Sequence, residues 1–132
     1  MNTLVVYYSK TGNTKKVAQS VIGGIDCEYD ELQYDEKAKS ISYAHDPSDF
    51  EHIILLSPVW AFSLAEPMKL YLAKEKGKIK NYDLIVTCGA MGLQGCVKNC
   101  ESAIGKAPDN AMKFKAAKVK SGEYDLSPVL QR

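Results

Sequence analysis

The segment Ser9-Lys10-Thr11-Gly12-Asn13-Thr14 places three hydroxyl side chains and a glycine within six residues. It follows a short apolar run and precedes a stretch whose apolar residues have helical spacing. The N-terminus of a helix offers backbone N–H groups without partners and the positive end of the helix dipole, so anions bind there. Hydroxyl groups add donors, and Gly12 lets the backbone approach a ligand closely. The segment therefore predicts a phosphate site.

The same residue types also have a simpler use, because Ser, Thr and Asn cap helices without any ligand. Helix capping alone is therefore the alternative to a phosphate site. The segment has neither Gly-x-x-x-x-Gly-Lys-Ser/Thr nor Gly-x-Gly-x-x-Gly, so sites for nucleoside triphosphates and dinucleotides lack their sequence signatures.

Two further segments carry residues suited to a flat ligand. Trp60 is the only tryptophan and lies in a predicted loop, where its face can stack on an aromatic ring or simply anchor the loop. Phe62 is a weaker candidate for the same contact. Gly89 and Gly92 free the backbone to approach a ligand, and ordinary turns are the alternative.

The elements that must position these segments alternate between strand and helix. Apolar segments without alternation predict strands buried on both faces of a parallel sheet, at residues 3–8, 52–57 and 84–88. Apolar residues at helical spacing follow them, at residues 17–22, 68–72 and 97–104. Charged segments predict two edge strands, at residues 27–33 and 112–120. The order predicts an α/β fold with right-handed crossovers.

Two details of this pattern lead to specific expectations. In residues 112–120 the lysines occupy odd positions before Ala116 and even positions after Ala117. This change of register predicts a bulge or a change of direction in the last strand. We interpret these lysines as solvated edge charge, with a functional basic patch as the alternative. Residues 34–51 contain the turn Asp46-Pro47-Ser48-Asp49 and little helical pattern, so we expect that crossover to be mostly irregular.

The chain of 132 residues, 45% hydrophobic and 25% charged, is typical of one globular domain spanning residues 1–132. It has no apolar run long enough for a membrane span and no signal-peptide pattern, so we expect a cytoplasmic protein that binds no membrane. The net charge of +1 argues against nucleic acid as a partner. That sum hides an acidic first half and a basic second half.

Metal, disulfide and hydrolytic sites lack support. The four cysteines form no Cys-x-x-Cys pair, and His45 and His52 have no partner by spacing, so we assign neither metal ligands nor catalytic residues. Cys96 and Cys100 share one predicted helix, whose N-terminus lowers a thiol pKa. We nevertheless interpret both as small buried hydrophobic residues, with a reactive thiol as the alternative.

The segment Tyr8–Thr14 resembles the phosphate loop of the flavodoxin family, which has the pattern Ser/Thr-x-Thr-Gly-x-Thr. Residues 57–62 resemble that family's loop along one side of the FMN isoalloxazine, and residues 88–92 resemble the loop on its pyrimidine side. The resemblance covers residues 1 to about 120. It implies a flavodoxin-like three-layer sandwich with a five-stranded parallel sheet of order 2-1-3-4-5 and FMN at the carboxyl ends of the strands.

The resemblance also implies a set of FMN-binding residues and a function. The function is electron transfer to or from a protein partner. The alternatives are an NAD(P)H-dependent FMN/quinone oxidoreductase with a small quinone-like acceptor, and a phosphate-binding module without flavin. The implied binding residues are Ser9, Lys10, Thr11, Gly12, Asn13, Thr14, Pro58, Val59, Trp60, Ala61, Phe62, Cys88, Gly89, Ala90, Met91 and Gly92.

Three departures from the family pattern bear on the function. Electron carriers of this family are strongly acidic, whereas this chain is nearly neutral. The segment 88–92 has no aromatic residue to cover the second flavin face. Ala61 stands where many members have Gly, and a non-glycine residue resists positive φ by about 1 kcal/mol, so we expect a backbone flip there to be less favourable.

The C-terminus is short for this fold. After Lys120 the sequence provides a turn and about one helical turn beginning at Ser127-Pro128. We therefore expect part of the sheet beside the first helix to be uncovered and to be buried in a twofold homodimer, with Val129 and Leu130 in the contact.

Overall fold

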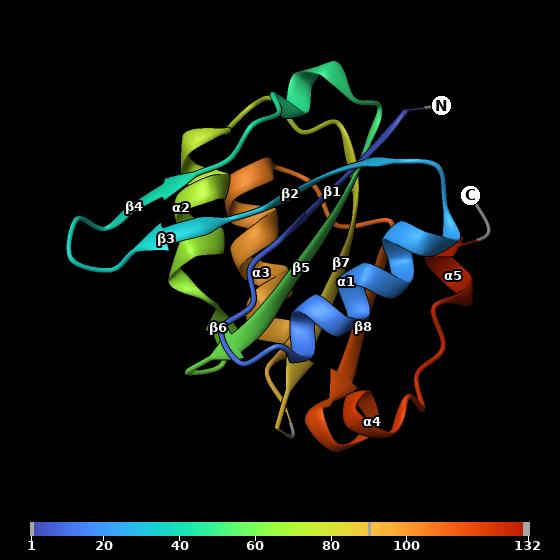
Figure 1. Cartoon of the computed structure of the whole chain (residues 1–132). Coiled ribbons are helices and arrows are strands. Elements are labelled where there is room, and N and C mark those ends of the chain that lie inside the picture. Colours follow the sequence, from blue (N-terminus) through green and yellow to red (C-terminus); the bar gives the residue numbers. More distant parts are fainter. Residues whose placement is uncertain (1, 90, 131–132) are drawn as a thin grey trace.

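The centre of the molecule is a sheet with five parallel strands and one short antiparallel strand, β6 (Ser63–Leu64), shown in Figure 1 as a computed structural model that describes residues 2–89 and 91–130. In spatial order its parallel strands are β2 (Glu28–Glu31), β1 (Thr3–Tyr7), β5 (His52–Trp60), β7 (Asn81–Cys88) and β8 (Asn110–Lys115). Numbered along the chain without the small hairpin strands, this order is 2-1-3-4-5, and every pairing among these five is parallel. The predicted flavodoxin-like topology is confirmed.

Apolar side chains of the central strands feed two cores on opposite faces of the sheet. Leu4 and Val6 point to one face, whereas Val5 and Tyr7 point to the other. Because both faces are covered, β1 is buried along its whole length, which explains its apolar sequence without alternation.

Helices cover the two faces and complete three layers (Figure 1). On one face lie α2 (Glu66–Lys74) and α3 (Leu93–Ile104), packed through Met68 and Cys100 among others. On the other face lie α1 (Asn13–Gly24), α4 (Ala116–Ser121) and α5 (Ser127–Leu130). These short helices bury one apolar stripe each against the sheet.

The crossover between β2 and β5 has more structure than its sequence predicted. It contains a hairpin of β3 (Gln33–Asp35) and β4 (Ser40–Ser42), followed by the 3-10 turn η1 (Pro47–Asp49). Tyr34 and Ile41 are directly opposite each other in the hairpin. A two-stranded hairpin this short has a weak sequence pattern, and packing of Ile41 and Tyr43 against the core stabilises it.

The last predicted strand is shorter than expected. It ends at Lys115, and α4 begins at Ala116. The switch of the lysines from odd to even positions therefore marks a change from strand to helix. The predicted change of direction is confirmed, and the predicted strand through Lys120 is wrong.

The segment after α4 folds back over the sheet, so the expectation of an uncovered face is wrong. Val119, Leu126 and Val129 are buried beside α1, and Leu130 packs close to Gly24. An extended link joins α4 to α5 (Figure 1). Leu126 in this link is buried in the core on this face, and the prediction counted only the length of the last helix. Val129 is fully buried within the chain and is not available for a dimer contact. Among the described residues, no helix is long and apolar enough to cross a bilayer.

Candidate functional site

The loop between β1 and α1 has the local geometry of an anion site. Gly12 has a φ of 101°, a left-handed conformation that glycine adopts without strain. Its N–H donates to Ser9 Oγ at 3.1 Å, which curves the loop. Within the part of the chain that the structure describes, no side chain caps the first turn of α1, so its backbone N–H groups have no side-chain acceptor there. Helix capping, the alternative explanation for these residues, is therefore not what the loop does.

Thr14 differs from the other hydroxyl residues of this loop because its side chain is buried. Its Oγ1 lies 2.7 Å from Thr87 Oγ1, near the end of β7. A hydroxyl has one donor and two acceptor sites, so Thr14 can still bind a second group. The contact ties the start of α1 to the carboxyl end of the sheet. Thr11 is exposed and Asn13 is half-buried.

Trp60 lies at the end of a strand rather than in a loop. The strand β5 continues to Trp60 and turns back into β6 (Ser63–Leu64), with Trp60 opposite Ser63. The turn residues Ala61 and Phe62 have φ values of 51° and 65°. Ala61 thus adopts the positive φ that a non-glycine residue resists, because a tight two-residue hairpin imposes that conformation, and the expectation about a backbone flip there stays a prediction.

The tryptophan ring contacts the phosphate-type loop directly. The rings of Trp60 and Tyr8 meet edge to face, with centroids 5.7 Å apart. Lys10 Nζ lies 5.4 Å from the centre of the Trp60 ring, a cation–π distance. The half-buried indole of Trp60 and the loop of residues 9–14 thus form one site at the carboxyl edge of the sheet. The two are 46 or more residues apart in sequence.

The N-terminal half of α3 holds the β5–β6 hairpin in place. A Cβ at residue 95 would overlap the carbonyl oxygen of Phe62, so only glycine permits this approach of helix and turn. The side chain of Asn99 accepts a hydrogen bond from the Leu64 N–H at 3.0 Å. The sequence analysis did not identify Gly95 or Asn99 as residues of the site. Each acts through a tertiary contact that sequence spacing does not reveal.

The remaining predicted residues line the same edge. Pro58 pairs with Thr87 in the sheet, and Val59 packs against Gly92 at the start of α3. Cys88 ends β7 and is buried. Gly89 is exposed, and Met91 is 63% exposed. Ala90 lies outside the described residues.

The cysteines of α3 are buried hydrophobic residues, as interpreted from the sequence. Burial raises the pKa of Cys96 to about 11 and that of Cys100 to about 12. The helix N-terminus therefore does not lower the pKa of Cys96, because desolvation of the thiolate is the larger effect. All four cysteines are free thiols.

Both histidines have carboxylate partners that sequence spacing did not reveal. His52 Nε2 lies 2.9 Å from Asp83 Oδ2, with Asp109 nearby, at the amino end of the sheet. His45 Nδ1 lies 2.8 Å from Asp30 Oδ1, and this hydrogen bond raises the pKa of His45. Parallel register brings His52 and Asp83 together on adjacent strands, far from Trp60. Neither pair belongs to the candidate site.

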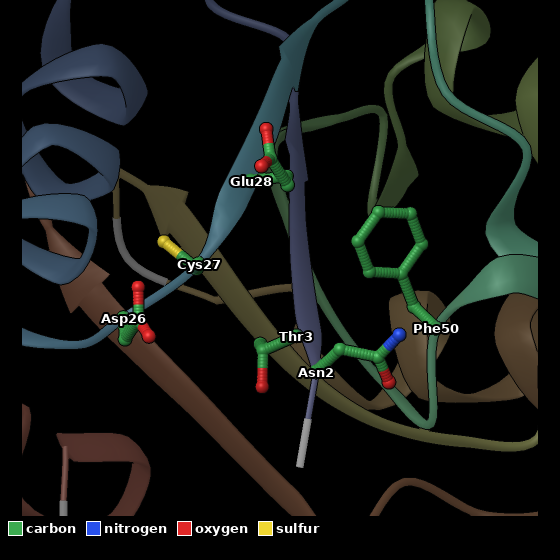
Figure 2. A pocket seen from close by; sticks show the side chains of 6 residues that line it. All are labelled: Asn2, Thr3, Asp26, Cys27, Glu28 and Phe50. Atoms are coloured by element: carbon green, nitrogen blue, oxygen red, sulfur yellow. The ribbon is translucent and has the colours of Figure 1, made fainter.

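A separate pocket opens at the amino end of β1 and β2 (Figure 2). It has a volume of about 350 Å³ and contains the half-buried Cys27 thiol. Burial, followed by the charges of Asp26 and Glu28, raises the pKa of Cys27, so that thiol is not activated. The residues that line the pocket are Asn2, Thr3, Asp26, Cys27, Glu28 and Phe50. Ligands of open α/β sheets bind at the opposite edge, where Trp60 lies.

Comparisons with known proteins agree with this geometry. A family model described as a flavodoxin domain matches residues 4–127. A flavoprotein of Lactobacillus acidophilus NCFM, solved in complex with FMN, is 21% identical with a TM-score of 0.71 over 91% of this chain and 97% of that chain. A flavodoxin, WrbA-like protein of Agrobacterium tumefaciens is 15% identical with a TM-score of 0.62 over 98% and 95%.

A larger protein contains a similar part. The rubredoxin oxygen:oxidoreductase of Desulfovibrio gigas is 16% identical with a TM-score of 0.65 over 98% of this chain and 36% of that chain. A search of curated proteins gave no match.

Proposed function

The chain belongs to the flavodoxin family, and from that premise we propose that it binds one FMN and carries electrons to or from a protein partner. FMN is the cofactor of this family. The observation that carries the proposal is the uncapped first turn of α1 beside Gly12, next to the indole of Trp60. A phosphate and a flat aromatic ring are the two groups that such a pair of sites accepts.

The residues present fit this cofactor. Apart from the two residues adjacent to Gly12 in sequence, no described residue has a heavy atom within 4 Å of the position that a Cβ of Gly12 would take, so the loop leaves space for a phosphate group. Ser9, Thr11 and Asn13 supply polar side chains around that space, and Lys10 adds a positive charge. When bound, FMN supplies the acceptance and release of electrons.

The chain's own part in the reaction is to bind, orient and shield. The backbone N–H groups of α1 and the side chain of Thr11 would hold the phosphate, while Thr14 ties this turn to β7 through Thr87. Trp60 would stack on the ring and exclude water from one face. Residues 88–92 would supply backbone groups to its polar edge, and Gly95 and Asn99 hold the hairpin that carries Trp60.

Titration of the purified protein with FMN tests the proposal. We expect micromolar or tighter binding, with quenching of flavin fluorescence by Trp60. Thr11→Ala should weaken binding about fivefold, because one hydrogen bond contributes about 1 kcal/mol, and Thr11→Ser should restore it. If calorimetry detects no binding of FMN, the alternative function, a phosphate-binding module without flavin, would be favoured instead.

A second candidate function is an NAD(P)H-dependent quinone oxidoreductase. The observation in its favour is the segment 88–92, which has no aromatic side chain, and whose Met91 extends into solvent. Such a flavin face would be open to a small substrate. Anaerobic mixing with NADPH distinguishes the two functions. In an oxidoreductase, NADPH alone would bleach the bound flavin and a quinone would restore its colour. In an electron carrier, the flavin would be reduced only after a reductase protein is added.

A further inference from the structure

Two large apolar side chains extend into solvent beside the candidate site. Phe62 is 66% exposed at the tip of the β5–β6 hairpin, and Met91 is 63% exposed just before α3. Among the described residues, Tyr29 is the one other large hydrophobic side chain with comparable exposure. Exposed apolar groups gathered at one edge are typical of a protein interface.

Exposed lysines lie on a loop, a strand end and two helices at the same edge of the sheet. Lys10 lies over Trp60, and Lys115 pairs with Cys88, the residue before Gly89. Lys16 Nζ donates to the carbonyl oxygen of Lys120 at 3.1 Å, which places α4 beside the first turn of α1. We call Lys10, Lys16, Lys115 and Lys120 the lysine rim, and all four are exposed.

Several carboxylates near this edge are already paired with other lysines. Glu31 lies 3.6 Å from Lys15, and Glu123 lies 2.8 Å from Lys118. Glu66 at the start of α2 likewise pairs with Lys39 at 3.5 Å, whereas the exposed Glu36, which acts on Tyr8, has no salt bridge among the described residues. Among the described residues, none of the four lysines of the rim forms a salt bridge, so their positive charge is available to a partner.

We propose that the lysine rim, together with Phe62 and Met91, is the docking surface for an acidic redox protein. The proposal rests on the proposed function and names the charge of its partner. An apolar centre with a charged margin is how transient protein interfaces are built. Opposite charge steers the partner to the site and sets its orientation. Direct contact at this edge would bring the partner's redox centre near the flavin.

Binding measurements with two probes of opposite charge test this surface. The acidic probe is a plant-type ferredoxin and the basic probe is cytochrome c, each titrated into ¹⁵N-labelled protein with and without FMN. We expect ferredoxin to bind at least about tenfold more tightly than cytochrome c at low salt. Its affinity should fall about tenfold between about 20 and about 200 mM NaCl, because salt screens exposed charges. Amide shifts should centre on Phe62 and Met91.

Charge-reversal variants locate the surface. Lys115→Glu with Lys120→Glu should weaken ferredoxin binding at least about tenfold, as opposed charges become like charges. The matched control is Lys76→Glu with Lys80→Glu, two exposed lysines at the amino edge of the sheet, which should change the affinity less than about twofold. Circular dichroism and the FMN affinity of each variant show whether it is folded.

Three results would overturn the proposal: equal ferredoxin binding by both double variants, tighter binding of cytochrome c, or self-association of the chain through the lysine rim in sedimentation without a probe. The FMN titration separates these from failure of the proposed function. Absence of FMN binding contradicts the electron-carrier function. If the protein binds FMN but does not bind ferredoxin, only the docking surface is contradicted.

Discussion

Gly95 of α3 touches the backbone of Phe62 so closely that no side chain fits between them. This contact sets the distance between the helix and the turn after Trp60. A residue without a functional group thus controls the placement of the candidate stacking residue.

Gly95→Ala should destabilise the protein by about 1–3 kcal/mol, the usual cost of overpacking, and displace the hairpin. Because Trp60 is the only tryptophan, its fluorescence spectrum reports that displacement directly. Urea denaturation measures the free energy of unfolding. The control is Gly23→Ala in α1, where a Cβ meets no atom within 4 Å and alanine favours helix by roughly 0.5–1 kcal/mol. Equal stability of the two variants would show that the turn adapts freely.

Asn99→Ala removes the hydrogen bond to the Leu64 N–H. The loss should cost about 1 kcal/mol and shift the Trp60 emission, since the hairpin then lacks its hydrogen bond to α3. Ser102→Ala, an exposed change on the same helix, is the control and should alter neither signal. Unchanged emission in Asn99→Ala would mean that this bond does not position the hairpin.

The sequence predicted the buried strands and the first loop because both have strong local patterns, whereas the sheet order followed from the resemblance to the flavodoxin family. It missed features that arise from contacts between distant segments. The link through Leu126 and the His52–Asp83 pair depend on which strands and helices are neighbours. Ala61 shows the same limit, because the short antiparallel pairing of Val59 with Leu64 fixes its positive φ. The binding roles of the site residues stay predictions.

Thr87→Val should leave the buried Thr14 hydroxyl without its partner. An unsatisfied buried hydroxyl costs about 1–3 kcal/mol, and valine preserves the shape of threonine, so packing is not the cause of any loss. We expect lower stability in urea and weaker FMN binding, because the first turn of α1 is no longer tied to β7. The variant Thr87→Ser keeps the hydroxyl and should retain both properties. Full FMN affinity in Thr87→Val would show that Thr14 needs no support from β7.

The buried thiols of α3 should make the fold less stable at alkaline pH. An unfolded cysteine has a pKa of about 8.5, whereas burial raises the pKa of Cys96 to about 11 and that of Cys100 to about 12. Between these values the folded state binds more protons than the unfolded state, so the free energy of unfolding falls as pH rises through that window. Below about pH 8 the thiols are protonated in both states and the effect vanishes.

Urea denaturation at about pH 8 and about pH 10.5 measures this loss, which is one part of the total because buried tyrosines such as Tyr82 also have a raised pKa. The double variant Cys96→Ala with Cys100→Ala isolates the thiols: it is less stable at neutral pH through lost packing, but should lose less stability on going to alkaline pH. A parallel decline of native protein and double variant would contradict the prediction and would mean that the thiols ionise while the protein remains folded. Alkylation by iodoacetamide, which reacts with the thiolate, should then proceed in the folded state, whereas we expect Cys96 and Cys100 to react only after unfolding.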